Sequence, residues 1–285
     1  MTGADAALRA LIERHFEERA GLTPANAPRE LQAALDECLG LLGSGRARVA
    51  EPGDGGWRVN EWLRKAVLLH FRTHDNAVVE AGALRFFDKL PLKYRDYDAA
   101  SFRADGTRVV PGAIVRAGAH VARDAVLMPC FVNVGAWIGP GSMVDTWATV
   151  GSCAQIGRDV HLAGGVGIGG VLEPPGARPV IVEDHAFIGS RCVVVEGTVV
   201  EEGAVLGALT VITASTRILD VTGDEVVEHK GRIPAWSVVI PGTRPKRFPA
   251  GEFGVPCALI IGRRSASTDQ KVSLNAALRE HDVPV

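Results

Sequence analysis

The sequence of 285 residues has few aromatic side chains, little net charge and no long hydrophobic run, and each shortage excludes a class of protein. Phe, Trp and Tyr together make up 6% of the chain, which argues against a large aromatic core. A formal net charge of −2 provides no electrostatic attraction for nucleic acid. No apolar stretch approaches the roughly 20 residues that span a bilayer, and residues 1–21 lack the apolar core of a signal peptide. We therefore expect a soluble protein that binds neither nucleic acid nor membrane.

Cysteine is scarce as well, and the spacing of the cysteines matches no disulfide or metal motif. The cysteines are odd in number, widely separated and without a CxxC pair, which argues against a disulfide framework or a zinc ribbon. No neighbouring His and acidic residue marks any of them as a nucleophile. We expect all five to pack as small hydrophobic residues in a reducing compartment, the cytoplasm: Cys38, Cys130, Cys153, Cys192 and Cys257.

The first hundred residues have a helical pattern. Apolar residues recur at spacings of three and four over residues 6–19 and 29–42, which predicts two helices. A third is predicted over Asn60 to Phe71, with Asn60 as its N-cap. The pattern changes near Ala104, so residues 1–104 are expected to form a mainly helical N-terminal domain.

Beyond Ala104 the sequence has a period of six. Glycine often follows the repeated aliphatic residue, which suits a tight corner, whereas a β-sandwich would alternate with period two and turn at irregular intervals. Each hexapeptide thus predicts one short strand and a corner, and three make one triangular coil of a parallel β-helix. The repeated positions are Ile138, Val144, Val150, Ile156, Leu162 and Ile168, then, after the proline-rich residues 173–181, Val182, Ile188, Val194, Val200, Leu206, Ile212 and Ile218.

Several longer runs carry a more specific signal: MVDTWATVGSCAQIG (Met143 to Gly157), HLAGGVGIGGVLEP (His161 to Pro174) and VVEGTVVEEGAV (Val194 to Val205). Together with LTPAN, SGRARVAE and WLRKAVLLHFR in the N-terminal part, they resemble the tetrahydrodipicolinate N-succinyltransferases. The resemblance implies a mainly β fold: a left-handed parallel β-helix of hexapeptide repeats (105–245) with an N-terminal α-helical domain (1–104) and a short C-terminal extension (246–285). It covers residues 22–242 and is weak in the last forty residues.

The resemblance also implies the chemistry. Such an enzyme moves a succinyl group from succinyl-CoA, a co-substrate, to the amino group of a ring-opened dicarboxylate. It is a homotrimer with active sites between subunits and holds no permanent cofactor. The same reaction with acetyl-CoA, or a non-catalytic scaffold or regulator, are the alternatives.

Asp145 is the first candidate for catalysis and for substrate binding. It stands at a corner where neighbouring coils carry Gly139 and Gly151, so its carboxylate should project outward. An aspartate at such a corner also commonly caps its own turn. Glu196 is a second catalytic candidate. The family places a further glutamate three residues earlier, where this chain has Val193, so either Glu196 takes that role or Asp145 acts alone with water.

Cationic residues are needed for both substrates. Arg108, in GTRVVP, matches the family's substrate-binding arginine, and a guanidinium pairs with a carboxylate through two parallel donors. For CoA we expect the small residues Gly165 and Gly167 to let the pantetheine arm approach the backbone. Lys246 and Arg247, with further cations at Arg263, Arg264 and Lys271, are available for its phosphates.

No metal site is expected. A zinc lyase of related fold would need three histidines converging at a subunit interface. The candidates His120, His161 and His185 do not have the required spacing, although His161 is placed to border the active-site cleft.

Overall fold

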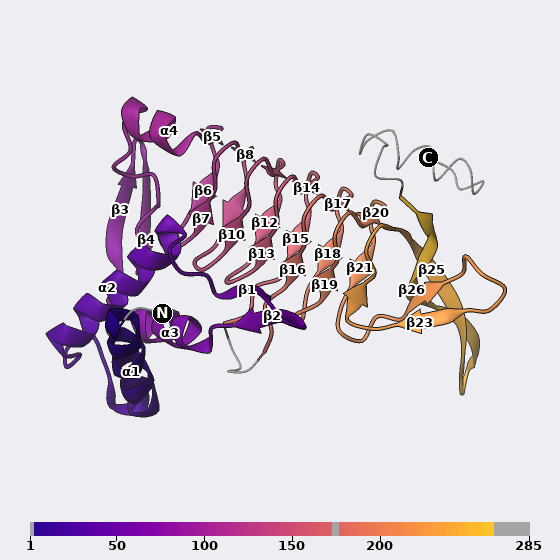
Figure 1. The fold of residues 1–285 in the computed structure, drawn as a ribbon, viewed down its shortest axis with the longest axis horizontal. Helices are drawn as coiled ribbons and strands as arrows, with labels where there is room; N and C mark the ends of the chain where they lie inside the picture. The colour runs from indigo at the N-terminus through magenta and orange to yellow at the C-terminus, as the bar shows by residue number, and fades with distance from the viewer. Residues whose placement is uncertain (1–2, 173–176, 265–285) are drawn as a thin grey trace.

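The computed structural model describes residues 3–172 and 177–264. Helices lie at one end, stacked coils of short strands form the body, and a long hairpin projects at the other end (Figure 1). The helices are α1 (Gly3–Glu17), the 3₁₀ turn η1 (Arg19–Gly21), α2 (Arg29–Ser44), α3 (Glu61–Thr73) and α4 (Ala99–Asp105). Two small hairpins accompany them: β1 (Ala50–Gly53) with β2 (Gly56–Val59), and β3 (Ala77–Ala81) with β4 (Leu84–Asp88).

The three expected helices are present, with one local correction. Asn60 is the N-cap residue of α3 by position, but its side chain makes no capping bond. Its Nδ2 instead donates to the backbone oxygen of Arg48, 2.7 Å away. Helix α2 ends where Gly45 takes a left-handed conformation with φ of 76°, which glycine adopts without steric cost.

The body is a parallel β-helix with three walls, each a sheet in which every strand pairs with the strand one coil away. Wall A contains β5 (Arg108–Val109), β8 (Val126–Leu127), β11 (Met143–Val144), β14 (His161–Leu162), β17 (Phe187–Ile188) and β20 (Val205–Leu206). Wall B contains β6 (Ile114–Val115), β9 (Phe131–Val132), β12 (Thr149–Val150), β15 (Gly167–Ile168), β18 (Val193–Val194) and β21 (Val211–Ile212). Wall C contains β7 (His120–Val121), β10 (Trp137–Ile138), β13 (Gln155–Ile156), β16 (Ile181–Val182), β19 (Val199–Val200) and β24 (Arg232–Ile233).

The period of six is confirmed by burial. Each of the thirteen repeated aliphatic residues is at most 2% exposed and belongs to one continuous core inside the coils. Small residues fill the remaining inward positions, as with Ala148 and Ala186. Leu172 departs from the pattern, because it packs against the helical domain and not inside the coils. The slip in the repeat lies at residues 128–130, where the corner between β8 and β9 is one residue shorter than in later coils.

The helical domain and the coils share a second core. Val134 and Cys153 of the β-helix pack with Leu35, Leu63 and other residues of α2 and α3. The buried side chain of Arg64 donates to the backbone oxygens of Ala177 and Leu172 and pairs with Glu61. These contacts tie α3 to the segment that interrupts the repeat.

A long hairpin closes the far end of wall A. Strand β25 (Ser237–Phe248) pairs with β20 through its first residues and then projects beyond the coils with β26 (Gly251–Arg263) (Figure 1). β26 returns beside β22 (Ile218–Asp220), which also pairs with β23 (Val227–His229). Ala258 and Ile260 of β26 are fully buried in the β-helix core. The domain limits at residues 104 and 245 remain predictions. Ala258 and Ile260 lie beyond the second limit, although they belong to the β-helix core.

Candidate active site

Asp145 lies at the edge where wall A turns into wall B. This A/B edge consists of the corner residues 110–113, 128–130, 145–148, 163–166, 189–192 and 207–210 in successive coils. Asp145 is one-third exposed, and its Oδ1 accepts a 2.6 Å hydrogen bond from the backbone N–H of Thr146. The carboxylate therefore caps its own turn and faces solvent at the same time, since Oδ2 is left available.

His161 stands beside this carboxylate on the next coil. β11 pairs with β14 so that Met143 is opposite His161, and the Nε2 atom of His161 lies 3.8 Å from Oδ2 of Asp145. The ring also meets Phe187 edge to face, with centroids 5.1 Å apart. The imidazole of His161 thus contacts an aromatic ring and lies near the carboxylate of Asp145. Sequence reasoning placed His161 only at the border of the site.

The backbone of the A/B edge repeats one unusual conformation. Trp147, Gly165, Arg191 and Leu209 occupy the same corner position in four successive coils, and all have positive φ between 61° and 71°. The side chain of Arg191 covers Gly165, where an added Cβ would lie 2.7 Å from Cδ of Arg191. Trp147 is 74% exposed two residues after Asp145, which leaves a large apolar surface beside the carboxylate.

Arg108 lies on the outer face of wall A, two strands before β11. Neighbouring strands are about 4.8 Å apart, so its backbone is about 10 Å from that of Met143 along the coil axis. The side chain is exposed and forms no hydrogen bond or ion pair with another described side chain. The same wall therefore carries Arg108, Met143 and His161 in sequence along one ladder.

Glu196 is not beside Asp145 within one chain. It follows β18 of wall B and lies at the edge between walls B and C, where its Oε2 accepts from the backbone N–H of Ala214 at 3.1 Å. Val193, at the start of β18, points outward from wall B and is 36% exposed. Asp145 thus lies at the edge between walls A and B, and Glu196 at the edge between walls B and C.

The glycines of GGVGIGG have different structural roles. A Cβ at Gly170 would lie 2.3 Å from the backbone nitrogen of Ser152, so close packing between coils requires glycine there. At Gly167 an added Cβ would only approach Val193 at 3.9 Å, which is ordinary contact. Gly167 therefore leaves a gap in the outer surface of wall B that the fold itself does not require.

Lys246 and Arg247 are exposed near the tip of the β25–β26 hairpin, remote from the A/B edge of the same chain. Arg263, at the other end of β26, donates to Asp220 at 2.7 Å, and Arg264 donates to the backbone oxygen of His185. Lys271 lies outside the described residues. A hollow of about 450 Å³ lies beneath the β3–β4 hairpin, and another of about 400 Å³ lies between Trp57 and Trp137. Asp145 lines neither of them.

The cysteines are buried and free, as expected. Burial raises the pKa of their thiols, to about 11 at Cys192 and to about 12 at Cys38, Cys130 and Cys153. A thiol with so high a pKa is a poor nucleophile at neutral pH. The three candidate histidines do not converge within one chain. His120 lies on wall C, His161 on wall A, and His185 at the edge between walls C and A.

A parallel β-helix of hexapeptide coils, with Asp145 and His161 close together on one outer edge, is the architecture of a hexapeptide-repeat protein. Residues 7–73 match the model of the N-terminal domain of tetrahydrodipicolinate N-succinyltransferase, and residues 179–214 match that of the hexapeptide repeat of succinyl-transferase. The 2,3,4,5-tetrahydropyridine-2,6-dicarboxylate N-succinyltransferase of Sodalis glossinidius is 50% identical over 95% of this chain and 97% of its own length. The proteins of that name from Polynucleobacter asymbioticus and Pectobacterium atrosepticum are 51% and 53% identical over 95% and 96% of this chain, and over 98% of their own lengths. The chain belongs to the tetrahydrodipicolinate N-succinyltransferase family.

Proposed function

We propose that this protein transfers the succinyl group of succinyl-CoA to the amino group of ring-opened tetrahydrodipicolinate, a step of lysine and diaminopimelate biosynthesis. The observation that carries the proposal is the pair formed by Asp145 and His161 at the A/B edge, 3.8 Å apart, in a chain of this family. An amine attacks a thioester only in its neutral form, so the site needs a group that accepts or orients its proton.

Asp145 is suited to this role. Its Oδ1 is held by the N–H of Thr146, which fixes the carboxylate, while Oδ2 faces His161 and solvent. As the amine nitrogen bonds to the thioester carbon, its proton passes to Asp145 directly or through water. The carbon–sulfur bond then breaks, and the CoA thiolate leaves and takes up a proton. Most backbone N–H groups at the A/B edge already donate to backbone oxygens, whereas those of Gly164 and Ser190 do not and would be the donors for the transient oxyanion.

Arg108 would hold a carboxylate of the acceptor. Its exposed side chain is on the wall that also carries His161, and no described side chain pairs with it. A guanidinium binds a carboxylate through two parallel hydrogen bonds and so fixes orientation as well as charge. In this arrangement the acceptor lies along the outer face of wall A with its amine near Asp145.

A homotrimer would complete the site. Asp145 and Glu196 are on different edges of one chain, but in a ring of three β-helices one edge of each copy can face another edge of the next copy. The exposed apolar residues Trp147, Leu209 and Val211 lie on or beside the A/B edge and would be covered by such a neighbour. Light scattering on the purified protein should give three times the 30.1 kDa chain mass. A monomer with full activity would contradict the shared site.

The acyl-CoA would lie along the surface near Gly165 and Gly167, with the open backbone at Gly167 because the side chain of Arg191 covers Gly165. The gap at Gly167 gives room for the pantetheine arm against wall B. Lys246 and Arg247 lie far from Asp145 of their own chain, so they would meet CoA phosphates only through a neighbouring copy. The proposed location is the cytoplasm, which is consistent with five free buried cysteines. Within the described residues, no helix is both long and apolar enough to cross a membrane.

Release of CoA thiol tests the proposal. The purified protein is given tetrahydrodipicolinate with either succinyl-CoA or acetyl-CoA, and initial rates are compared. Strong preference for succinyl-CoA is expected. A preference for acetyl-CoA would assign the protein to the acetyl-transferring variant of the reaction and refute the succinyl assignment.

A non-catalytic scaffold or regulator is the second candidate. The observation in its favour is Val193, an exposed apolar residue where the family resemblance places a glutamate. Binding of CoA with no thiol release from either thioester would support this candidate over the enzyme.

A further inference from the structure

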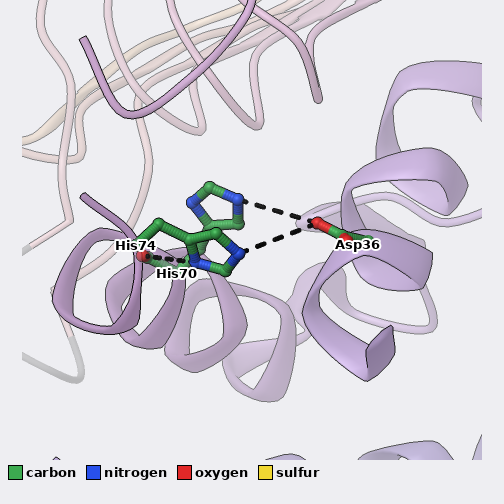
Figure 2. A group of neighbouring side chains, drawn as sticks. All are labelled: Asp36, His70 and His74. Carbon is green, nitrogen blue, oxygen red and sulfur yellow. Dashed lines mark hydrogen bonds and ion pairs between the residues drawn. The ribbon is translucent and has the colours of Figure 1, made fainter. Parts of the chain in front are cut away.

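A histidine pair faces an aspartate in the helical domain, away from the A/B edge. His70, in α3, and His74, which follows it, present their Nε2 atoms to Oδ1 of Asp36 in α2, at 3.9 and 4.0 Å (Figure 2). The two rings are stacked, with centroids 3.7 Å apart and planes within 4° of parallel. Within residues 3–172 and 177–264, no other group of three or more His, Cys, Asp or Glu residues brings its ligand atoms within 4.8 Å of one another.

Hydrogen bonding fixes the tautomer of His74. Its Nδ1 lies 3.1 Å from the backbone oxygen of His70, and a carbonyl oxygen only accepts, so Nδ1 carries the proton. In the neutral ring the Nε2 lone pair is then directed at Asp36. An Nδ1–H bond to a backbone carbonyl is also the usual support of a metal-binding histidine, because it orients the ring and raises its basicity.

His70 is available as the second nitrogen ligand. Its side chain is 5% exposed. Its Nε2 faces the same Oδ1 atom of Asp36 as the Nε2 of His74 does. Asp36 is 69% exposed and leaves an open approach from solvent.

We propose that Asp36, His70 and His74 bind one divalent transition-metal ion of the zinc class. Two imidazoles and a carboxylate suit zinc and its first-row neighbours and do not suit magnesium, which prefers oxygen ligands. With bonds of about 2.0–2.1 Å, tetrahedral ligand atoms are roughly 3.3 Å apart. The carboxylate must therefore move several tenths of an ångström closer than its present 3.9 and 4.0 Å separations.

The stacked rings must also separate, because parallel lone pairs do not meet at one ion. His74 is the ring that can tilt, since it is the C-cap residue of α3 and is 23% exposed, whereas His70 is held in the core. Water would supply the fourth ligand. Lys89 carries a positive charge that would repel a metal ion, but its Nζ donates to the backbone oxygen of Phe71 and not to the cluster.

The bound ion would link α2 to α3, two helices that already share the core of the N-terminal domain. A ligand that binds only the folded state stabilises it in proportion to the logarithm of its concentration over Kd. The expected effect is thus a rise in the melting temperature of the protein, with no requirement for the ion in acyl transfer at the A/B edge.

The test uses the full-length protein without an affinity tag, stripped with a chelator and dialysed. Zn²⁺ is titrated in competition with a chromophoric chelator, and Co²⁺ is added separately to record the absorption of a metal held by imidazole and carboxylate. We expect about one Zn²⁺ per chain and a higher melting temperature with Zn²⁺ but not with Mg²⁺.

His74→Asn is the decisive variant, because it removes a ligand at a partly exposed position where the fold should tolerate it. It should weaken Zn²⁺ binding by at least about tenfold and remove the thermal shift, and so should Asp36→Asn. His185→Asn is the matched control, since His185 also faces an aspartate, Asp159 at 3.6 Å, but without a second histidine there. It should bind Zn²⁺ as the unmodified protein does. Equal Zn²⁺ affinity in the unmodified protein and His74→Asn, or no saturable binding up to about a millimolar, would overturn the proposal.

Discussion

The Nε2 atom of His161 lies 3.8 Å from Oδ2 of Asp145 across two neighbouring coils of the β-helix. Strand pairing sets this distance, because Met143 and His161 are partners in wall A and Asp145 follows two residues after Met143. The pair is therefore part of the coil geometry and does not depend on a loop. The other carboxylate oxygen of Asp145, Oδ1, accepts a hydrogen bond from the N–H of Thr146. His161 therefore faces Oδ2, the oxygen that can accept a proton from the substrate amine.

His161→Asn should reduce kcat by roughly tenfold or more, because Asp145 would lose the neighbour that orients Oδ2. The KM for succinyl-CoA should change little, which separates this role from substrate binding. Steady-state kinetics with both substrates varied gives the two parameters. His185→Asn, at the other aspartate–histidine pair, serves as the control. An unchanged kcat in His161→Asn would remove His161 from the site.

Arg108→Lys should raise the KM for the acceptor by about tenfold, because an ammonium group replaces the two parallel donors of the guanidinium. The KM for succinyl-CoA should stay the same. Arg85→Lys is a suitable control, since Arg85 is an exposed arginine of β4 that pairs only with Glu80 among the described side chains. Equal acceptor KM in Arg108→Lys and the unmodified enzyme would refute the assignment.

Gly167→Leu should raise the KM for succinyl-CoA by about tenfold and leave the melting temperature nearly unchanged. The added side chain has room at its Cβ, 3.9 Å from Val193, but would fill the gap offered to the pantetheine arm. Gly170→Ala provides the contrast, because its Cβ would meet backbone at 2.3 Å and should lower the melting temperature. Kinetics and thermal unfolding of both variants distinguish the two effects. A normal KM in Gly167→Leu would place CoA elsewhere.

The β-helix could be predicted from sequence because its order is periodic. Every sixth residue points inward from its short strand, as Val150 and Val194 do. Once one such position is identified in the sequence, the period of six therefore gives the rest of the core. The period fails where the chain leaves the coils. Leu172 turns to the helical domain, and β25 and β26 form a hairpin that no hexapeptide spacing indicates.

The functional residues on the coils could likewise be placed from the period of six, whereas those in the helical domain could not. Asp145 could be placed at an outward corner from the frame alone, and the spacing of about 18 residues per coil is a sequence signal that also puts His161 beside it. The separation of Glu196 from Asp145 follows from the same count. The approach of Asp36 to His70 and His74 could not be foreseen, because it depends on how α2 and α3 pack across 34 residues of sequence.

Turnover by Asp145→Asn tests the central claim most directly. Thiol release would be followed with saturating succinyl-CoA and acceptor, beside Asp159→Asn, which alters the aspartate of the pair at the edge between walls C and A. We predict that Asp145→Asn lowers kcat by at least about a hundredfold with its oligomeric state unchanged, as expected for loss of general-base assistance. Asp159→Asn should stay within about twofold of the unmodified enzyme, because the A/B edge is untouched. A nearly normal rate in Asp145→Asn would contradict the account of this site.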